Sequence, residues 1–210
     1  MKGVYINLEQ RTDRREHFEN RVKNHGFFEG IERMPAIENK DGAIGCGLSH
    51  IKALRLCDNF DEPYVVIMED DFTIIQEEHL NKFVCDFEKI KDVDDWQIIV
   101  LTPRGITIPG TAEMAIADFT RIKENQTTTG YIVKKEMIPV LMHNIKEAIE
   151  LQIKGADKNV SSIDQYWKRI QLEYPFYYYS HIYAGQLPGW SNIEQRWVDY
   201  NDRFRNQGFY

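Results

Sequence analysis

Apolar positions along the chain fall into two alternating patterns. Short and largely apolar runs, typical of strands, occupy residues 3–8, 64–68, 97–101, 127–133 and 175–179. Between them, apolar side chains recur at helical spacing, as in the stripe formed by Leu80, Phe83, Val84, Phe87 and Ile90. Strands that alternate with helices predict an α/β fold in which helices flank a mainly parallel central sheet.

Capping residues mark the starts of several predicted helices. Thr12 or Asp13 suits the start of a helix that reaches residue 25, Ser49 suits the N-cap of a second, and Ser161 opens a late one. A long loop such as residues 102–125 is typical of a lid or a binding loop. We expect loops of irregular structure at residues 26–44, 102–125 and 181–191.

The most apolar run ends in three adjacent acids. Residues 64–68 lead directly into Glu69, Asp70 and Asp71. Such a run is typical of a strand buried on both faces, and α/β proteins bind ligands at the carboxyl ends of these strands. Three carboxylates there need a counter-ion, and clusters of oxygen ligands suit Mg²⁺ or Mn²⁺. A solvated acidic turn is the alternative.

Composition narrows the class of protein. With 42% hydrophobic and 28% charged residues, the 210-residue chain is globular, and we expect a single domain over residues 1–210. The net charge of −7 argues against a nucleic-acid partner. Three cysteines without metal-binding spacing favour a reducing, cytoplasmic setting. We expect no signal peptide and no transmembrane segment, which leaves peripheral contact with a membrane open.

Two further polar segments adjoin predicted elements. Arg11, Asp13, Arg14 and Arg15 stand between the first strand and its helix, where basic groups and free backbone N–H groups suit a phosphate or nucleotide. A solvated, charged helix start is the alternative. Residues 45–50 combine two glycines, which permit close approach to a ligand, with a histidine that could equally be a hydrogen-bonded structural residue.

Several segments, in order, carry a family resemblance. The first match is to an "INL…R.DR" opening, formed by Ile6–Asn7–Leu8 with Arg11, Asp13 and Arg14. The second is to a "GC..SH" segment, formed by Gly45–Cys46 with Ser49–His50. The third is to "(L/M)EDD", formed by Met68–Glu69–Asp70–Asp71. They are followed by Tyr131–Ile132–Val133, Asp164 at the start of a late helix, and Gln186 with Ser191. The ordered set, from residue 3 to about residue 193, resembles glycosyltransferase family 25, which includes lipooligosaccharide and collagen galactosyltransferases.

The resemblance implies a GT-A-type fold and a metal-dependent, inverting transfer. A hexose, galactose or glucose, would pass from a nucleotide-sugar, UDP-linked by family analogy, to a hydroxyl of a glycan, lipid-linked saccharide or glycoprotein, as in lipopolysaccharide biosynthesis. The expected cofactor is Mn²⁺ or Mg²⁺, held by Glu69, Asp71 and His181. The general base would be Asp164. The expected donor-binding residues are Asn7, Leu8, Arg11, Arg14, Ser49, His50, Asp70, Tyr131, Gln186 and Ser191.

Some assignments have competing interpretations. Asp164 could be only the acid of a capping box begun by Ser161, and the base would then be Asp157 or Glu194. Residues 69–73 also mimic the D-x-D-x-T pattern of haloacid-dehalogenase-type phosphohydrolases, although Glu69 would put the nucleophilic carboxylate one methylene too far. A nucleotide-sugar-binding module without turnover is the third class.

Overall fold

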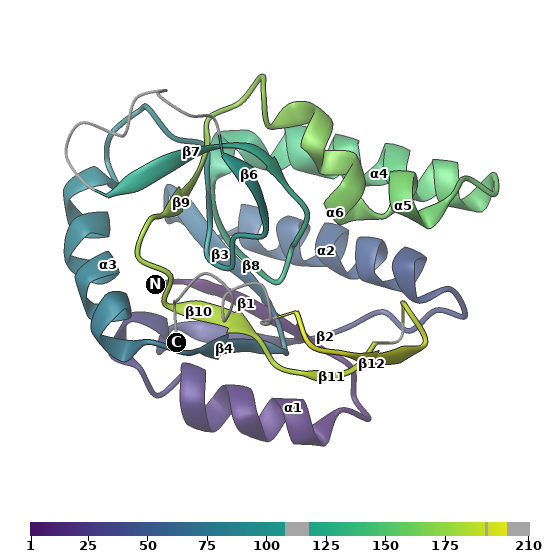
Figure 1. The fold of residues 1–210 in the computed structure, drawn as a ribbon, viewed down its shortest axis with the longest axis horizontal. Helices are drawn as coiled ribbons and strands as arrows, with labels where there is room; N and C mark the ends of the chain where they lie inside the picture. The colour runs from purple at the N-terminus through teal and green to yellow at the C-terminus, as the bar shows by residue number, and fades with distance from the viewer. Residues whose placement is uncertain (108–117, 192, 201–210) are drawn as a thin grey trace.

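One large mixed sheet forms the centre of the protein. The computed structural model describes residues 1–107, 118–191 and 193–200. Within this part the central sheet has eight strands in the order β2-β1-β3-β8-β5-β9-β7-β6 (Figure 1). Their bounds are β1 Gly3–Asn7, β2 Ile31–Pro35, β3 Tyr64–Glu69, β5 Ile98–Val100, β6 Gly105–Thr107, β7 Phe119–Asn125, β8 Gly130–Lys134 and β9 Phe176–Tyr179.

The α/β prediction is confirmed, and the sheet is mixed: β8 and β7 run against the other six strands. β1 pairs in parallel with β2 and β3, and β5 with β9, whereas β8 is antiparallel to both β3 and β5. The backbone N–H of Leu101 bonds to the carbonyl of Gly130 at 2.9 Å, so the chain leaves β5 and enters β8 at the same edge. The chain in β8 therefore runs in the direction opposite to β5. Hydrophobic periodicity reports burial and carries no information about strand direction.

Helices cover both faces of this sheet. They are α1 Thr12–His17, α2 Gly42–Asp58, α3 Glu77–Ile90, α4 Ile138–Ile153, α5 Lys158–Ser161 and α6 Ile163–Tyr166, with a π-helical turn at Phe18–Val22 and 3₁₀ turns at Gly26–Phe28, Lys135–Met137 and Trp167–Ile170. Because side chains alternate along a strand, Val65 and Ile67 pack in one core with α2 and α4. Val66 and Met68 pack in a second core with α3. Figure 1 shows α2 and α4 side by side, with α1 on the other side of the molecule.

Two small sheets bring the end of the chain back to β3. β4 (Phe72–Ile74), which follows the acids, pairs with β10 (Ala184–Gln186), and Gln186 lies opposite Phe72. β11 (Gly189–Ser191) and β12 (Arg196–Val198) form the second pair. Among the helices of the described residues, none is long and apolar enough to cross a membrane.

Several predicted element boundaries were wrong. α2 begins at Gly42, seven positions before Ser49, and Asp41 caps it by accepting the N–H of Ala43 at 2.9 Å. The glycine-rich start of α2 hides its helical spacing from sequence reading. Ser49 instead lies in mid-helix, where its hydroxyl donates to the carbonyl of Gly45 at 2.7 Å. At α1 the N-cap is Arg11, without a side-chain cap.

The three predicted loops contain strands. Residues 26–44 include β2, residues 102–125 include β6 and β7, and residues 181–191 include β10 and β11. Residues 108–117 lie outside the described part. With only three residues each, β6, β10 and β11 are too short to show a pattern of alternation in the sequence.

Candidate active site

A cavity of about 920 Å³ lies at the edge of the sheet where β1 and β3 end. Because β8 runs against β3, the residues that precede β8 reach the same edge, and the N–H of Glu69 bonds to the carbonyl of Thr129 at 2.8 Å. The cavity is lined by Glu69, Asp71 and Asp164. Eight of the ten residues expected to bind the donor also line it: Leu8, Arg11, Arg14, Ser49, His50, Asp70, Gln186 and Ser191.

Arg14 holds two of the three adjacent acids together. Its Nη1 donates to Asp70 Oδ1 and to Asp71 Oδ2, both at 2.9 Å. Asn7 adds a bond from Nδ2 to Asp70 Oδ2 at 2.7 Å, because β1 lies next to β3 in the sheet. Burial raises the pKa of Asp70, although Arg14 and Asn7 act against it. Asn7, expected at the donor, thus acts on the site through Asp70.

Asp71 is the least satisfied of the acids. Its Oδ2 accepts bonds from Arg14 and from Gln186 Nε2, the latter at 3.1 Å, and its backbone carbonyl accepts the N–H of Leu187 at 2.7 Å. Its Oδ1 is buried and has no hydrogen-bond partner. Burial, together with the charges of Glu69 and Asp70, raises the pKa of Asp71 to about 7. A buried carboxylate oxygen without a partner is costly, and it marks a place for a positively charged ligand.

Glu69 is held by a chain of buried polar groups. Its Oε1 lies 3.3 Å from His50 Nε2 and accepts the Thr128 hydroxyl at 2.8 Å. The other ring nitrogen of His50 lies 3.0 Å from the hydroxyl of Tyr131. Burial alone would raise the pKa of Glu69, but the bonds from His50 and Thr128 lower it below its ordinary value. His50 and Tyr131 are both buried and serve to orient Glu69.

Asp164 lies in the first turn of α6, on another wall of the same cavity. The expected capping box does not form: the N-cap is Ser162, and the hydroxyl of Ser161 donates to the carbonyl of Asp157 at 2.9 Å. Burial and the charge of Glu69 raise the pKa of Asp164 to about 6, against the charges of Arg104 and Lys168. A helix start stabilises a carboxylate and by itself makes it less basic, but at Asp164 burial outweighs that effect.

His181 is not brought together with Glu69 and Asp71. It follows β9, and β8 and β5 lie between β9 and β3 in the sheet. Its Nε2 lies 2.9 Å from Asp118 Oδ2 and 2.8 Å from Lys82 Nζ, in an exposed cluster away from the cavity. The assignment of His181 relied on the family resemblance and on its position in the sequence, which gives no information on strand order.

Sequence reading missed Thr128 and Arg104, which also line the cavity. A run of three threonines at the start of the predicted strand 127–133 was the available signal for Thr128. Arg104 lies 4.0 Å from the ring centre of Tyr200 and adds a positive charge near Asp164. It stands within a predicted loop, where nothing in the sequence distinguishes it from a solvated arginine.

Two groups of residues could hold a metal ion. The first, Cys46, His50 and Glu69, has its ligand atoms within 4.8 Å of one another. Its chemistry fits poorly, because burial raises the pKa of the Cys46 thiol well above its ordinary value and both nitrogens of His50 already have partners. The second is Glu69 with Asp71, where the unpartnered Oδ1 of Asp71 suits Mg²⁺ or Mn²⁺. This second set fits a divalent cation.

The fold and the cavity define an α/β protein with a cavity lined by polar side chains at the carboxyl ends of its strands, where such folds place their ligand sites. More specifically, the chain belongs to glycosyltransferase family 25 (LPS biosynthesis protein), whose family model matches residues 38–160. It is therefore a glycosyltransferase, and the predicted family is confirmed. The phosphohydrolase alternative is set aside. A comparison with curated proteins found no match.

Of three solved structures that align with this chain, one has a TM-score above 0.5 and shares the fold. A glycosyltransferase involved in the glycosylation of the major capsid of PBCV-1 aligns with a TM-score of 0.54 at 11% identity, covering 91% of this chain and 94% of that one. UDP-glucose pyrophosphorylase complexed with UDP-glucose aligns at 0.47, with 12% identity over 98% and 81% of the chains. The galactosyltransferase LgtC, in complex with donor and acceptor sugar analogs, aligns at 0.43, with 10% identity over 85% and 73%. At such identities the likeness concerns the fold alone.

Proposed function

We propose that this glycosyltransferase is metal-dependent and inverting, and that it moves a hexose, galactose or glucose, from a UDP-sugar to a hydroxyl of a saccharide, lipid-linked saccharide or glycoprotein acceptor. The observation that carries the proposal is the buried, unpartnered Oδ1 of Asp71 in a cavity that Asp164 also lines. A cytoplasmic setting is part of the proposal, supported by the free cysteines Cys46, Cys57 and Cys85.

Glu69 and Asp71 would hold the divalent cation. When bound, such an ion neutralises the negative charge that develops on a diphosphate leaving group. The protein's part is to hold two carboxylates in place before the ion arrives. His50 and Thr128 fix Oε1 of Glu69, while Gln186 and Arg14 fix Oδ2 of Asp71. Hydrogen bonds to one oxygen orient each carboxylate, and at Asp71 the other oxygen remains available to the cation.

Asp164 is the proposed general base. An inverting transfer needs a group that removes the proton of the attacking hydroxyl on the face opposite the leaving group. With a pKa of about 6, Asp164 is ionised at neutral pH and is more basic than an ordinary carboxylate. Asp157, the earlier alternative, caps α5 through the N–H of Asn159 at 2.7 Å, which uses one of its oxygens. Glu194, the other alternative, is paired with Arg196 and Tyr200.

The basic wall of the cavity suits the diphosphate. Arg11 and Arg14 line it beside Leu8, at the end of β1 and the start of α1. Arginine suits phosphate oxygens because its planar group donates two parallel hydrogen bonds. Ser49, Gln186 and Ser191 line the same cavity and supply further polar groups for the nucleotide or the sugar.

Hydrolysis of the donor tests the proposal without knowledge of the acceptor. Purified protein is incubated with UDP-galactose, UDP-glucose and the corresponding GDP- and ADP-sugars, with Mn²⁺, with Mg²⁺ and with EDTA. We expect slow release of the nucleotide from a UDP-hexose that requires the cation. Release that is equal in EDTA would contradict metal dependence. Tight nucleotide binding without release from any donor, and without transfer to added saccharides, would favour the non-catalytic module.

A further inference from the structure

One arginine occupies part of the place where the cation is expected. A single nitrogen of Arg14 contacts both Asp70 and Asp71, and the three side chains are 15%, 8% and 7% exposed. A Cβ atom added at Gly189 would lie 3.4 Å from Arg14 Nη2, so β11 passes close to the guanidinium. Arg14 is thus held among the acids as a counter-ion that belongs to the chain itself.

The position of Arg14 affects what the acids can bind. Its guanidinium donates to Oδ2 of Asp71, and the unpartnered Oδ1 belongs to the same carboxylate. A divalent ion on Oδ1 would therefore lie close to the guanidinium, and like charges at such distances in a buried site repel strongly. A diphosphate in the cavity would relieve this repulsion, because its negative oxygens attract both the ion and Arg14.

We propose that Arg14 couples the two ligands of this site: it weakens binding of the divalent cation alone, and it strengthens binding of the cation together with the donor diphosphate. The inference rests on the proposed metal dependence and adds that the cation binds tightly only when the nucleotide is also bound. In the absence of nucleotide, Arg14 neutralises Asp70 and Asp71 and the cation binds weakly. With nucleotide present, Arg14 contacts the diphosphate, and the carboxylate of Asp71 becomes available to the cation. Such a coupling is reciprocal, so the cation strengthens nucleotide binding by the same factor.

Arg11 supplies the matched control. It lines the same cavity and carries the same charge. Its guanidinium pairs with Asp13, at 2.9 Å and 2.8 Å, and not with the acids after β3. Replacing Arg11 removes a positive charge from the basic wall but leaves the counter-ion of Asp70 and Asp71 in place. The two substitutions therefore separate a general loss of positive charge from the specific contact that Arg14 makes.

The experiment measures Mn²⁺ binding by electron paramagnetic resonance, with and without UDP, against a blank of Mn²⁺ and UDP alone. For the unmodified protein we expect UDP to tighten Mn²⁺ binding by about 5-fold or more. Arg14→Ala should tighten binding of Mn²⁺ alone by a similar factor and weaken binding of UDP alone. In this variant the ratio of the Mn²⁺ affinities with and without UDP should be close to 1. Arg11→Ala should weaken UDP binding and leave the affinity for Mn²⁺ alone unchanged.

The outcomes distinguish this inference from the proposed function. If the unmodified protein binds Mn²⁺ but Arg14→Ala leaves the affinity for Mn²⁺ alone unchanged or weaker, the coupling is wrong while metal dependence stands. If the unmodified protein binds no Mn²⁺ with or without UDP, both are wrong. Should the melting temperature show that Arg14→Ala does not fold, Arg14→Lys replaces it. Lysine keeps the charge but loses the planar fork, so the UDP effect should shrink without vanishing, and an unchanged effect would overturn the proposal.

Discussion

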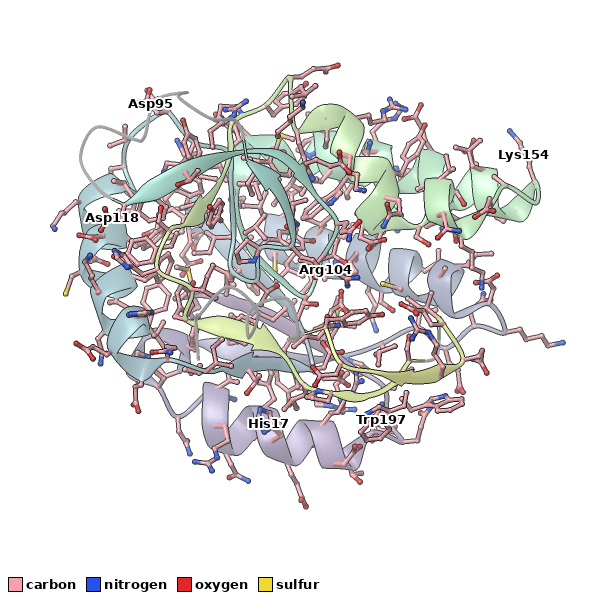
Figure 2. All side chains as sticks on the ribbon, in the orientation of Figure 1. His17, Asp95, Arg104, Asp118, Lys154 and Trp197 are labelled. Carbon is pink, nitrogen blue, oxygen red and sulfur yellow. The ribbon has the colours of Figure 1, made fainter. Side chains whose placement is uncertain are left out.

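Two charged clusters at the ends of sheet strands behave in opposite ways. After β3, Glu69, Asp70 and Asp71 line one cavity, and Arg14 pairs with Asp70 and Asp71. After β9, His181 joins Asp118 and Lys82 on the surface, with Lys82 Nζ 2.7 Å from Asp118 Oδ2. In Figure 2, Asp118 lies beside α3 at one side of the molecule, whereas Arg104, which lines the cavity, lies near the centre.

Burial accounts for the difference between the two clusters. Bonds from Lys82 and His181 lower the pKa of Asp118, so that carboxylate is stabilised where it stands. Burial raises the pKa of Asp71 to about 7, and one of its oxygens has no partner. Buried carboxylates with a raised pKa and an unpartnered oxygen are characteristic of functional sites. The surface cluster, by contrast, satisfies its own charges and leaves nothing for a ligand to complete.

The largest expected effect is on catalysis through Asp164. Asp164→Asn keeps the size of the side chain and removes the base, so we expect kcat to fall by ~10²–10⁴-fold with little change in donor affinity. Burial raises the pKa of Asp164 to about 6, so the unmodified enzyme loses its ionised base as the pH falls through that value. The ratio of the kcat of the unmodified enzyme to that of Asp164→Asn should therefore decrease as the pH falls. A variant with normal turnover, or a ratio that does not depend on pH, would contradict the assignment.

The next effect compares the two clusters directly. Asp71→Asn removes one carboxylate from the proposed cation site and should lower metal-dependent transfer by at least ~100-fold, with the fold intact by circular dichroism. Asp118→Asn makes the same chemical change in the surface cluster and should leave transfer within about 2-fold, since exposed ion pairs contribute little. Full activity of Asp71→Asn at saturating donor would remove Asp71 from the site.

A smaller effect is expected from the groups that orient Glu69. His50→Gln should weaken Mn²⁺ binding by roughly 10–100-fold, because residues that hold metal ligands typically contribute that much. Tyr131→Phe removes only the hydroxyl that contacts His50 and should have a weaker effect in the same direction. Calorimetry with Mn²⁺ at saturating UDP measures both variants. Unchanged cation affinity in His50→Gln would show that Glu69 does not depend on this chain of contacts.

The smallest expected effect is on stability. The pKa of Asp164 rises from its ordinary value of 3.8 to about 6 in the folded state, so the folded state binds the proton more tightly. The stability that this proton contributes is fully present below pH 3.8 and is lost as the pH rises through about 6. Asp164→Asn should therefore be more stable than the unmodified protein at pH 7.5, by roughly 1–3 kcal/mol. Urea unfolding at pH 7.5 and at pH 4 should show that the difference shrinks in acid.

The sequence was sufficient to predict the acids of the site but not their partners. The apolar run before Glu69 indicates a buried strand, and the acids at its end are visible without the fold. Contacts of Asp70 with Asn7 and Arg14 depend on β1 lying next to β3, and strand order is set by packing over the whole chain. The contact between His50 and Glu69 likewise requires α2 to cover the end of β3. His181 was misplaced for the same reason.

The most direct test of the central claim is a crystal structure with Mn²⁺ and UDP, with the ion located by its anomalous scattering. The account predicts an anomalous peak in the cavity, at about 2.0–2.3 Å from an oxygen of Asp71, with the diphosphate against the wall formed by Arg11 and Arg14. A peak beside His181 and Asp118, or UDP bound in the cavity without an ion near Asp71, would contradict it.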